Sequence, residues 1–100
     1  MDEPVKFLFL VTTSDAARIL VPLARACRRQ GAPWSCFLTH DGVRVLERDE
    51  VRAIIPDATR AVACEYSWER FMGTQPCPVE LGSQTDHSMM VGEAARVVSL

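Results

Sequence analysis

The sequence contains very little lysine. Ten of its 100 residues are arginine, but Lys6 is the only lysine, so the chain offers no interior amine. Enzymes that form a Schiff base with a carbonyl substrate need such an amine as their nucleophile, and that class is therefore excluded. The net charge is only −2. Neither a nucleic acid nor an anionic membrane surface is expected as a partner, because both attract strongly basic proteins.

Several motifs that mark common functions are also absent. No G-x-G-x-x-G or P-loop sequence occurs, so no glycine-rich cradle predicts binding of a dinucleotide or a nucleoside triphosphate. No G-x-S-x-G sequence marks the nucleophile of a serine hydrolase. His40 and His87 lack ligand-like spacing, and the four cysteines contain no C-x-x-C pair. The sequence therefore predicts neither a metal site nor a cofactor.

A long hydrophobic run is missing as well. The run from Phe7 to Val11 is too short to cross a membrane, and the acidic residues before it are wrong for a signal peptide. The expected location is therefore the cytoplasm. Stable disulfides are uncommon in that reducing compartment, so the four cysteines are expected to be free thiols.

What the sequence does contain is a single pattern of alternating strands and helices. The composition, 48% hydrophobic and 24% charged, suits one globular domain over residues 1–100. Apolar runs without alternation predict strands that are buried on both faces. The expected fold class is α/β: a single-domain three-layer sandwich with a mainly parallel sheet of about five strands. The expected strands are 5–11, 34–39, 59–64, 79–81 and 96–100, and the expected helices are 15–30, 42–55, 67–72 and 84–94.

Capping and breaking residues predict details of the first helix. Thr13 or Ser14 is expected to cap its amino terminus. Pro22 lies within the helical pattern and lacks a backbone N–H, so we expect a kink or a break near residues 18–22. Gly31 is expected to end the helix.

Similar signals predict the ends of later helices. Asp41 is expected to cap one continuous helix over residues 42–55, which Pro56 ends. Ser83 is followed three residues later by Asp86, which resembles a capping box at the start of the last helix.

Cys64 is the strongest candidate for a reactive residue. It closes a predicted strand and directly precedes a predicted helix. Backbone N–H groups and the helix dipole favour an anion at such a position, and they can lower a thiol pKa from about 8.5 toward or below neutrality. Glu65 and Glu69 oppose thiolate formation, and Arg70 could offset them. Such a cysteine can act as a nucleophile or as a carrier of sulfur.

Polar residues follow each of the first three predicted strands. Ligand sites in parallel sheets collect at the carboxyl ends of strands, so these residues are expected to converge on one edge. His40 could orient a substrate or accept a proton there, or it could simply complete a turn. The residues expected to line a cleft beside Cys64 are Thr13, Ser14, His40, Asp41 and Ser67.

The other cysteines carry weaker signals. Cys77 lies between two prolines in a predicted loop, where it is either a second, resolving or relay thiol or an incidental loop residue. Cys27 lies on the core stripe of a helix and Cys36 lies within a strand, so both are expected to be packing residues. His87, in the first turn of the last helix, is expected to serve surface or interface packing.

Several local strings, taken in order, resemble the DsrE/DsrF-like (YchN-like) family of sulfur-relay proteins. They are the strand 7–12, the string 37–43, the string 62–64 with Ser67, and residues 82–84 with 94–100. The resemblance implies a small α/β domain with a five-stranded, mainly parallel sheet, assembled into trimers or hexamers. It also implies that the cysteine after the third strand, here Cys64, accepts sulfane sulfur as a persulfide and passes it to a partner. The string Pro76-Cys77-Pro78 departs from the family pattern.

The resemblance and the residues together lead to one main functional hypothesis. Cys64 is expected to carry sulfur between a donor and an acceptor protein or small thiol, with no metal or organic cofactor, in a cytoplasmic homo-oligomer. One alternative is a non-catalytic oligomeric module that binds a small ligand or a protein. Another is a redox sensor in which Cys77 resolves an oxidised Cys64. Apolar residues expected to contribute to subunit contacts are Trp34, Trp68 and the cluster Met89-Met90-Val91.

Overall fold

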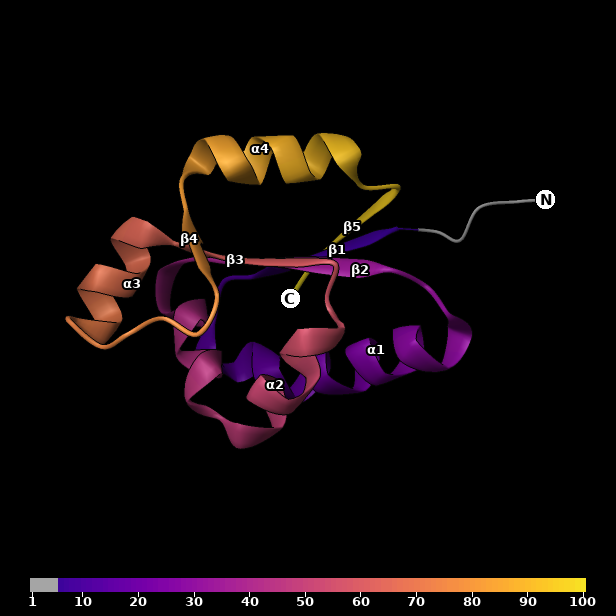
Figure 1. Cartoon of the computed structure of the whole chain (residues 1–100), viewed down its shortest axis with the longest axis horizontal. Helices are drawn as coiled ribbons and strands as arrows, with labels where there is room; N and C mark the ends of the chain where they lie inside the picture. The colour runs from indigo at the N-terminus through magenta and orange to yellow at the C-terminus, as the bar shows by residue number, and fades with distance from the viewer. Residues whose placement is uncertain (1–5) are drawn as a thin grey trace.

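Five parallel strands form the centre of the molecule (Figure 1). The structure, a computed structural model, describes residues 6–100. The strand order is β4-β3-β2-β1-β5, and every neighbouring pair is parallel. The predicted α/β class and the parallel sheet of about five strands are confirmed. The strands are β1 (Phe7–Val11), β2 (Trp34–Leu38), β3 (Arg60–Cys64), β4 (Glu80–Gly82) and β5 (Arg96–Ser99).

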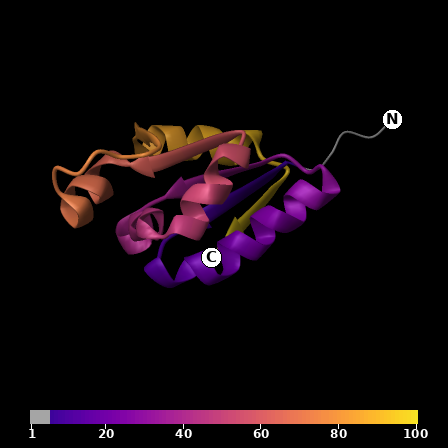
Figure 2. The ribbon, with the colours of Figure 1, turned by 60° about the horizontal axis from the view of Figure 1, so that its bottom comes forward.

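Helices cover both faces of this sheet, which completes the three layers. Figures 1 and 2 show α4 alone on one face and α1 with α2 on the other. None of the helices in residues 6–100 is long and apolar enough to cross a membrane. The α-helices are α1 (Ala17–Gln30), α2 (Asp49–Ile54), α3 (Glu65–Met72) and α4 (Gln84–Glu93), and the 3-10 segments are η1 (Ser14–Ala16), η2 (His40–Glu47) and η3 (Ile55–Asp57).

The first helix is continuous through Pro22, so the predicted break is wrong. Pro22 and Arg18 are both exposed, and water can therefore satisfy the Arg18 carbonyl that lacks a partner N–H. The predicted cap is wrong as well. The side chain of Thr13 makes no capping hydrogen bond, and Ser14 begins the 3-10 segment η1 instead. Gly31 ends the helix in the left-handed conformation, as predicted.

The single helix predicted over residues 42–55 is divided into two. The 3-10 segment η2 ends at an extended Arg48, and α2 begins after it. Asp41 lies inside η2 and makes no side-chain cap. A straight α-helix would place the buried Val45 about 200° around its axis from the buried Val43. Both valines lie inside η2, before the break, and its 3-10 winding of three residues per turn reduces their angular separation from about 160° to about 120°. The extended Arg48 then redirects the chain into α2.

The buried residues form two apolar clusters, one on each face of the sheet. The larger cluster lies between the sheet and α1, α2 and α3, and the smaller cluster contains Leu8, Phe37, Val62, Cys64 and Met90. Trp34 and Trp68 are only 2% and 5% exposed within the chain, so both are core residues. The expected subunit contact is wrong for Trp34, whereas for Trp68 the sequence also favoured packing against the sheet, which is confirmed. Met90 is buried too, whereas Met89 and Val91 are exposed.

Candidate functional site

Cys64 occupies two structural roles at once. It is the last residue of β3 and the N-cap residue of α3. The helix begins at Glu65 and not at Ser67, so Cys64 directly precedes it, as expected for this residue, and the thiol lies at the helix amino terminus. Backbone N–H groups of the first helical turn have no partner within the helix, and those of Tyr66 and Ser67 are directed at the Cys64 sulfur.

Two hydroxyl groups from neighbouring elements lie beside this thiol. Ser67 is buried in α3, and its Oγ accepts a hydrogen bond of 2.8 Å from the backbone N–H of His40. The Oγ1 of Thr39, which follows β2, lies 3.3 Å from the same oxygen. Since the His40 N–H holds the Ser67 oxygen in place, the Ser67 proton is free to point elsewhere. Both hydroxyl groups can therefore donate to the sulfur when it is ionised.

These contacts determine the acidity of the thiol. Burial raises the pKa of Cys64, but hydrogen bonds from the Ser67 hydroxyl and backbone, the Thr39 hydroxyl and the Tyr66 backbone lower it by more. The pKa of Cys64 therefore lies below the ordinary thiol value. A larger fraction of Cys64 is ionised at neutral pH than of an unperturbed cysteine, and the thiolate is the nucleophilic form.

A pocket of about 360 Å³ lies against Cys64. Its rim is acidic because Glu65 and Glu69 both line it. Arg70, expected as a possible counter-charge, instead lies over the ring of Phe71, with its guanidinium carbon 5.2 Å from the ring centroid. The complete lining is Cys64, Glu65, Tyr66, Glu69, Gly82, Ser83 and Gln84.

Glycine is required where β4 passes the thiol. Gly82 is the register partner of Cys64 across the β3–β4 pair. A Cβ atom at Gly82 would lie 2.6 Å from Cγ1 of Val62 and 2.7 Å from Oδ2 of Asp86. The predicted capping box is confirmed here: the Asp86 carboxylate accepts the Ser83 N–H at 2.8 Å, and Ser83 Oγ accepts the Thr85 N–H at 3.2 Å. The start of α4 is thereby fixed beside Cys64.

The loops predicted to meet at the carboxyl edge do meet, but they contribute unequally. Ser67 and His40 both take part, although His40 does so through its backbone N–H. None of the five residues predicted to line a cleft beside Cys64 lines this pocket: Ser67 and His40 act only through the hydrogen bonds described above, and Thr13, Ser14 and Asp41 are likewise absent from its lining. Thr39 belongs to the loop 39–41 that the sequence predicted at this edge, although it was not singled out. Gln84 was missed, although its place as the first residue after a helix cap was an available signal.

The remaining cysteines lack the features of a reactive thiol. Burial raises the pKa of Cys36 to about 12 and also raises the pKa of Cys27. Burial raises the pKa of Cys77 as well, and the Val79 backbone N–H offsets only part of this. All four cysteines are free. Cys77 packs against the larger apolar cluster and Cys64 belongs to the smaller one, so the sheet lies between their surroundings.

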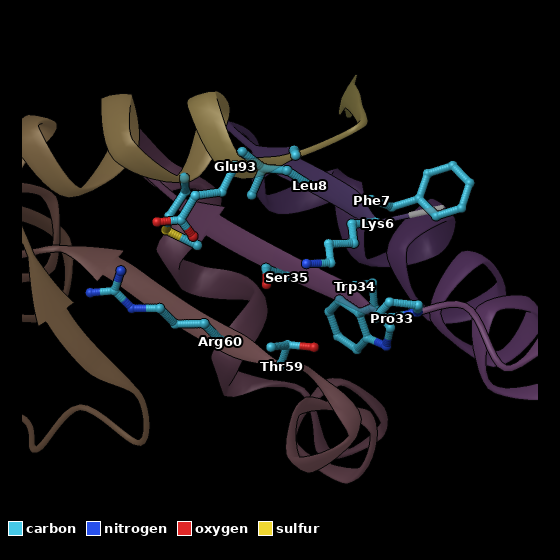
Figure 3. Close-up of a pocket in the computed structure, with 11 residues that line it drawn as sticks. Lys6, Phe7, Leu8, Pro33, Trp34, Ser35, Thr59, Arg60 and Glu93 are labelled. Atoms are coloured by element: carbon cyan, nitrogen blue, oxygen red, sulfur yellow. The ribbon is translucent and has the colours of Figure 1, made fainter. Parts of the chain in front are cut away.

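A second pocket lies at the opposite, amino-terminal edge of the sheet (Figure 3). It has a volume of about 260 Å³ and is lined by Lys6, Ser35 and Glu93 among others. It contains no thiol and no imidazole. Arg60 at its margin is already engaged, because its Nη2 lies 2.6 Å from Glu80 and 3.3 Å from Asp86. The pocket beside Cys64 is therefore the better candidate for chemistry.

Comparison with known proteins assigns no family and no function to this chain. No protein-family model matches this sequence, and no curated protein matches it. The resemblance to DsrE/DsrF-like proteins therefore stays a prediction. Within residues 6–100, no group of three or more histidine, cysteine, aspartate or glutamate side chains is placed to hold a metal ion.

Proposed function

We propose that the protein carries sulfane sulfur as a persulfide on Cys64 and passes it to a thiol acceptor. The observation that carries this proposal is the hydrogen-bonded thiol of Cys64, which starts a helix, has a lowered pKa and adjoins a pocket. Burial raises the thiol pKa of the three other cysteines. The five-stranded parallel sheet is also what the family resemblance implies.

The proposed reaction is a sulfur transfer without net oxidation. The Cys64 thiolate attacks the outer sulfur of a donor persulfide, R–S–SH, and the bond between the two donor sulfurs breaks. The products are the Cys64 persulfide and R–S⁻, which takes up a proton from water. In the second half, an acceptor thiolate attacks the outer sulfur, and Cys64 leaves as a thiolate. Groups that stabilise this thiolate therefore assist both halves.

The surroundings of Cys64 restrict what can serve as a donor. The residue is only 6% exposed, so a donor has to reach it through the pocket. The carboxylates of Glu65 and Glu69 repel a dianion such as thiosulfate. A persulfide on a protruding protein loop, or a singly charged hydropolysulfide, suits this rim better than a dianion. We place this exchange in the cytoplasm, where free thiols persist.

We also propose that the protein works as a homo-oligomer, a trimer or a hexamer as the resemblance implies. Met89 and Val91 on α4 are 54% and 39% exposed, and Val97 on the edge strand β5 is 43% exposed. Covering apolar side chains of this size with a second subunit removes their surface from water, which is favourable. Light scattering after gel filtration measures the subunit number.

A second candidate function is a binding module in which Cys64 is structural. The specific observation that favours it is the small exposed fraction of Cys64, 6%. A redox sensor with Cys77 as the resolving thiol is less favoured. The two cysteines pack in clusters on opposite faces of the sheet, so a disulfide between them requires local rearrangement.

Mass spectrometry of the intact, fully reduced protein tests the relay. Wild type, Cys64→Ser and Cys77→Ser are each incubated with inorganic polysulfide and then with dithiothreitol. We expect a gain of about 32 Da per added sulfur in wild type and in Cys77→Ser, reversed by the reductant. Cys64→Ser should show no gain.

Three results would count against the relay. Equal loading of wild type and Cys64→Ser would assign the sulfur to another thiol. No loading of wild type, with its thiols shown to be reduced, would leave the binding module as the better explanation. A mass loss of about 2 Da that needs both Cys64 and Cys77 would indicate a disulfide and hence the sensor.

A further inference from the structure

Gln84 connects Cys64 to a histidine. Gln84 is the first residue of α4, and its Nε2 lies 3.9 Å from the Cys64 sulfur. Its Oε1 lies 3.1 Å from Nδ1 of His87, three residues further along the helix. The three side chains therefore form a chain of polar contacts that ends at the thiol.

His87 is held in a fixed orientation within this chain. Its ring stacks on Phe37 of β2, with the centroids 4.8 Å apart and an angle of 15° between the planes. Its backbone N–H donates to the Ser83 carbonyl, which anchors it to the start of α4. The other ring nitrogen, Nε2, is buried and has no hydrogen-bond partner among the described residues.

The missing partner at Nε2 selects one tautomer of the neutral ring. A proton on Nε2 would be a buried donor with no acceptor, which costs more than leaving a lone pair there. The proton is therefore on Nδ1, and Nδ1–H donates to Oε1 of Gln84. An amide whose oxygen accepts from His87 must turn its NH₂ group toward the sulfur. Flipping the amide would place an oxygen there and force the proton onto Nε2.

We propose that His87 is a positioning residue that, through Gln84, holds an amide N–H donor against the sulfur of Cys64. The consequence for sulfur transfer rests on the proposed function, because Cys64 leaves as a thiolate when the outer sulfur goes to the acceptor. A donor that is already in place stabilises this charge without reorganisation. The Gln84 amide thereby adds a donor to the hydroxyl groups of Ser67 and Thr39 beside the thiol.

The test measures the rate of iodoacetamide alkylation of Cys64 from pH 5 to pH 10, in a Cys77→Ser background. Gln84→Met keeps the length of the side chain but removes the donor. His87→Phe keeps the ring on Phe37 but removes Nδ1, whereas His87→Asn keeps a donor near the Nδ1 position. Ser88→Ala, an exposed change on the same helix, is the control. The carboxylates of Glu65, Glu69 and Asp86 are unchanged in all variants.

We expect Gln84→Met and His87→Phe to shift the profile to higher pH by the same amount and to slow alkylation at pH 7 about three- to tenfold. The double variant should be no slower than either single one, and His87→Asn should stay close to wild type. An unchanged profile in Gln84→Met would overturn the proposal. So would equal slowing in both His87 variants, since loss of packing would then explain the effect.

Alkylation does not require sulfur transfer, so this test separates the two proposals. If polysulfide fails to load Cys64 but the variants shift the profile as expected, the relay is wrong and the positioning role of His87 holds. If loading succeeds and the profiles do not move, the relay holds and His87 only packs.

Discussion

The face of the sheet that packs on α1, α2 and α3 is buried much more thoroughly than the face that packs on α4. Among residues 6–100, nineteen buried residues form the first cluster and five form the second. The Cys64 thiol and its polar neighbours Gln84 and His87 lie with the smaller cluster. Most of the stability is therefore expected from one face, while the other holds a helix in place beside a thiol.

The largest expected effect comes from truncating one buried side chain on each face. Leu20→Ala removes a fully buried side chain on α1, and Met90→Ala removes the buried anchor of α4. We expect Leu20→Ala to lower the free energy of unfolding by about 4 kcal/mol and Met90→Ala by about 2 kcal/mol, because fewer neighbours surround Met90. Urea denaturation of both variants measures the difference.

The expected difference between the two faces would be contradicted if Met90→Ala lowered the free energy of unfolding by as much as Leu20→Ala. That result would mean that contacts with another subunit also stabilise the α4 face. Repeating the denaturation over a range of protein concentrations separates these cases, since the stability of an oligomer depends on concentration.

A smaller effect is expected from a matched pair of glycines. A methyl group at Gly82 would meet Val62 and Asp86, so Gly82→Ala should lower the free energy of unfolding by about 2 kcal/mol. It should also slow alkylation of Cys64, since the start of α4 would move. A methyl group at Gly92 within α4 meets no atom within 4 Å, so Gly92→Ala should stabilise the protein by up to about 1 kcal/mol. Thermal unfolding of both variants checks this, and a harmless Gly82→Ala would show that the strand and helix can separate freely.

The smallest stability effect is expected from Ser67→Ala. The variant leaves the His40 N–H without its acceptor, which should cost about 1 kcal/mol. It also removes the first of the hydrogen bonds that lower the pKa of Cys64, so that pKa rises. Less thiolate is then present at pH 7, and the alkylation profile shifts to higher pH. A shift to lower pH would contradict the assigned direction of that hydrogen bond.

Much of this arrangement is predictable from local sequence signals. Continuous apolar runs predicted the buried strands, and Ser83 with Asp86 predicted the capping box, because both patterns act over a few residues. Cys64 was recognisable for the same reason, since the end of a strand directly precedes the start of a helix.

The rest depends on contacts between distant segments. The division of residues 42–55 into η2 and α2 depends on burying Val43 and Val45 of η2 together with Val51 of α2 against distant segments, which no local pattern contains. Gln84 lies twenty residues after Cys64 in the sequence, and the pairing of β4 with β3 brings the two side chains together. Packing between distant segments likewise decides which of the polar residues after the strands reach the thiol.

The two edge strands of the sheet are short, with three residues in β4 and four in β5. Short edges present few unpaired backbone groups, and Glu80 and Arg96 add a charge to each. Such edges resist pairing with a strand from another molecule, which is a common route to aggregation. A second copy of this chain is therefore expected to bind through side-chain surfaces such as Met89 and Val91, so that assembly leaves the sheet at five strands per subunit.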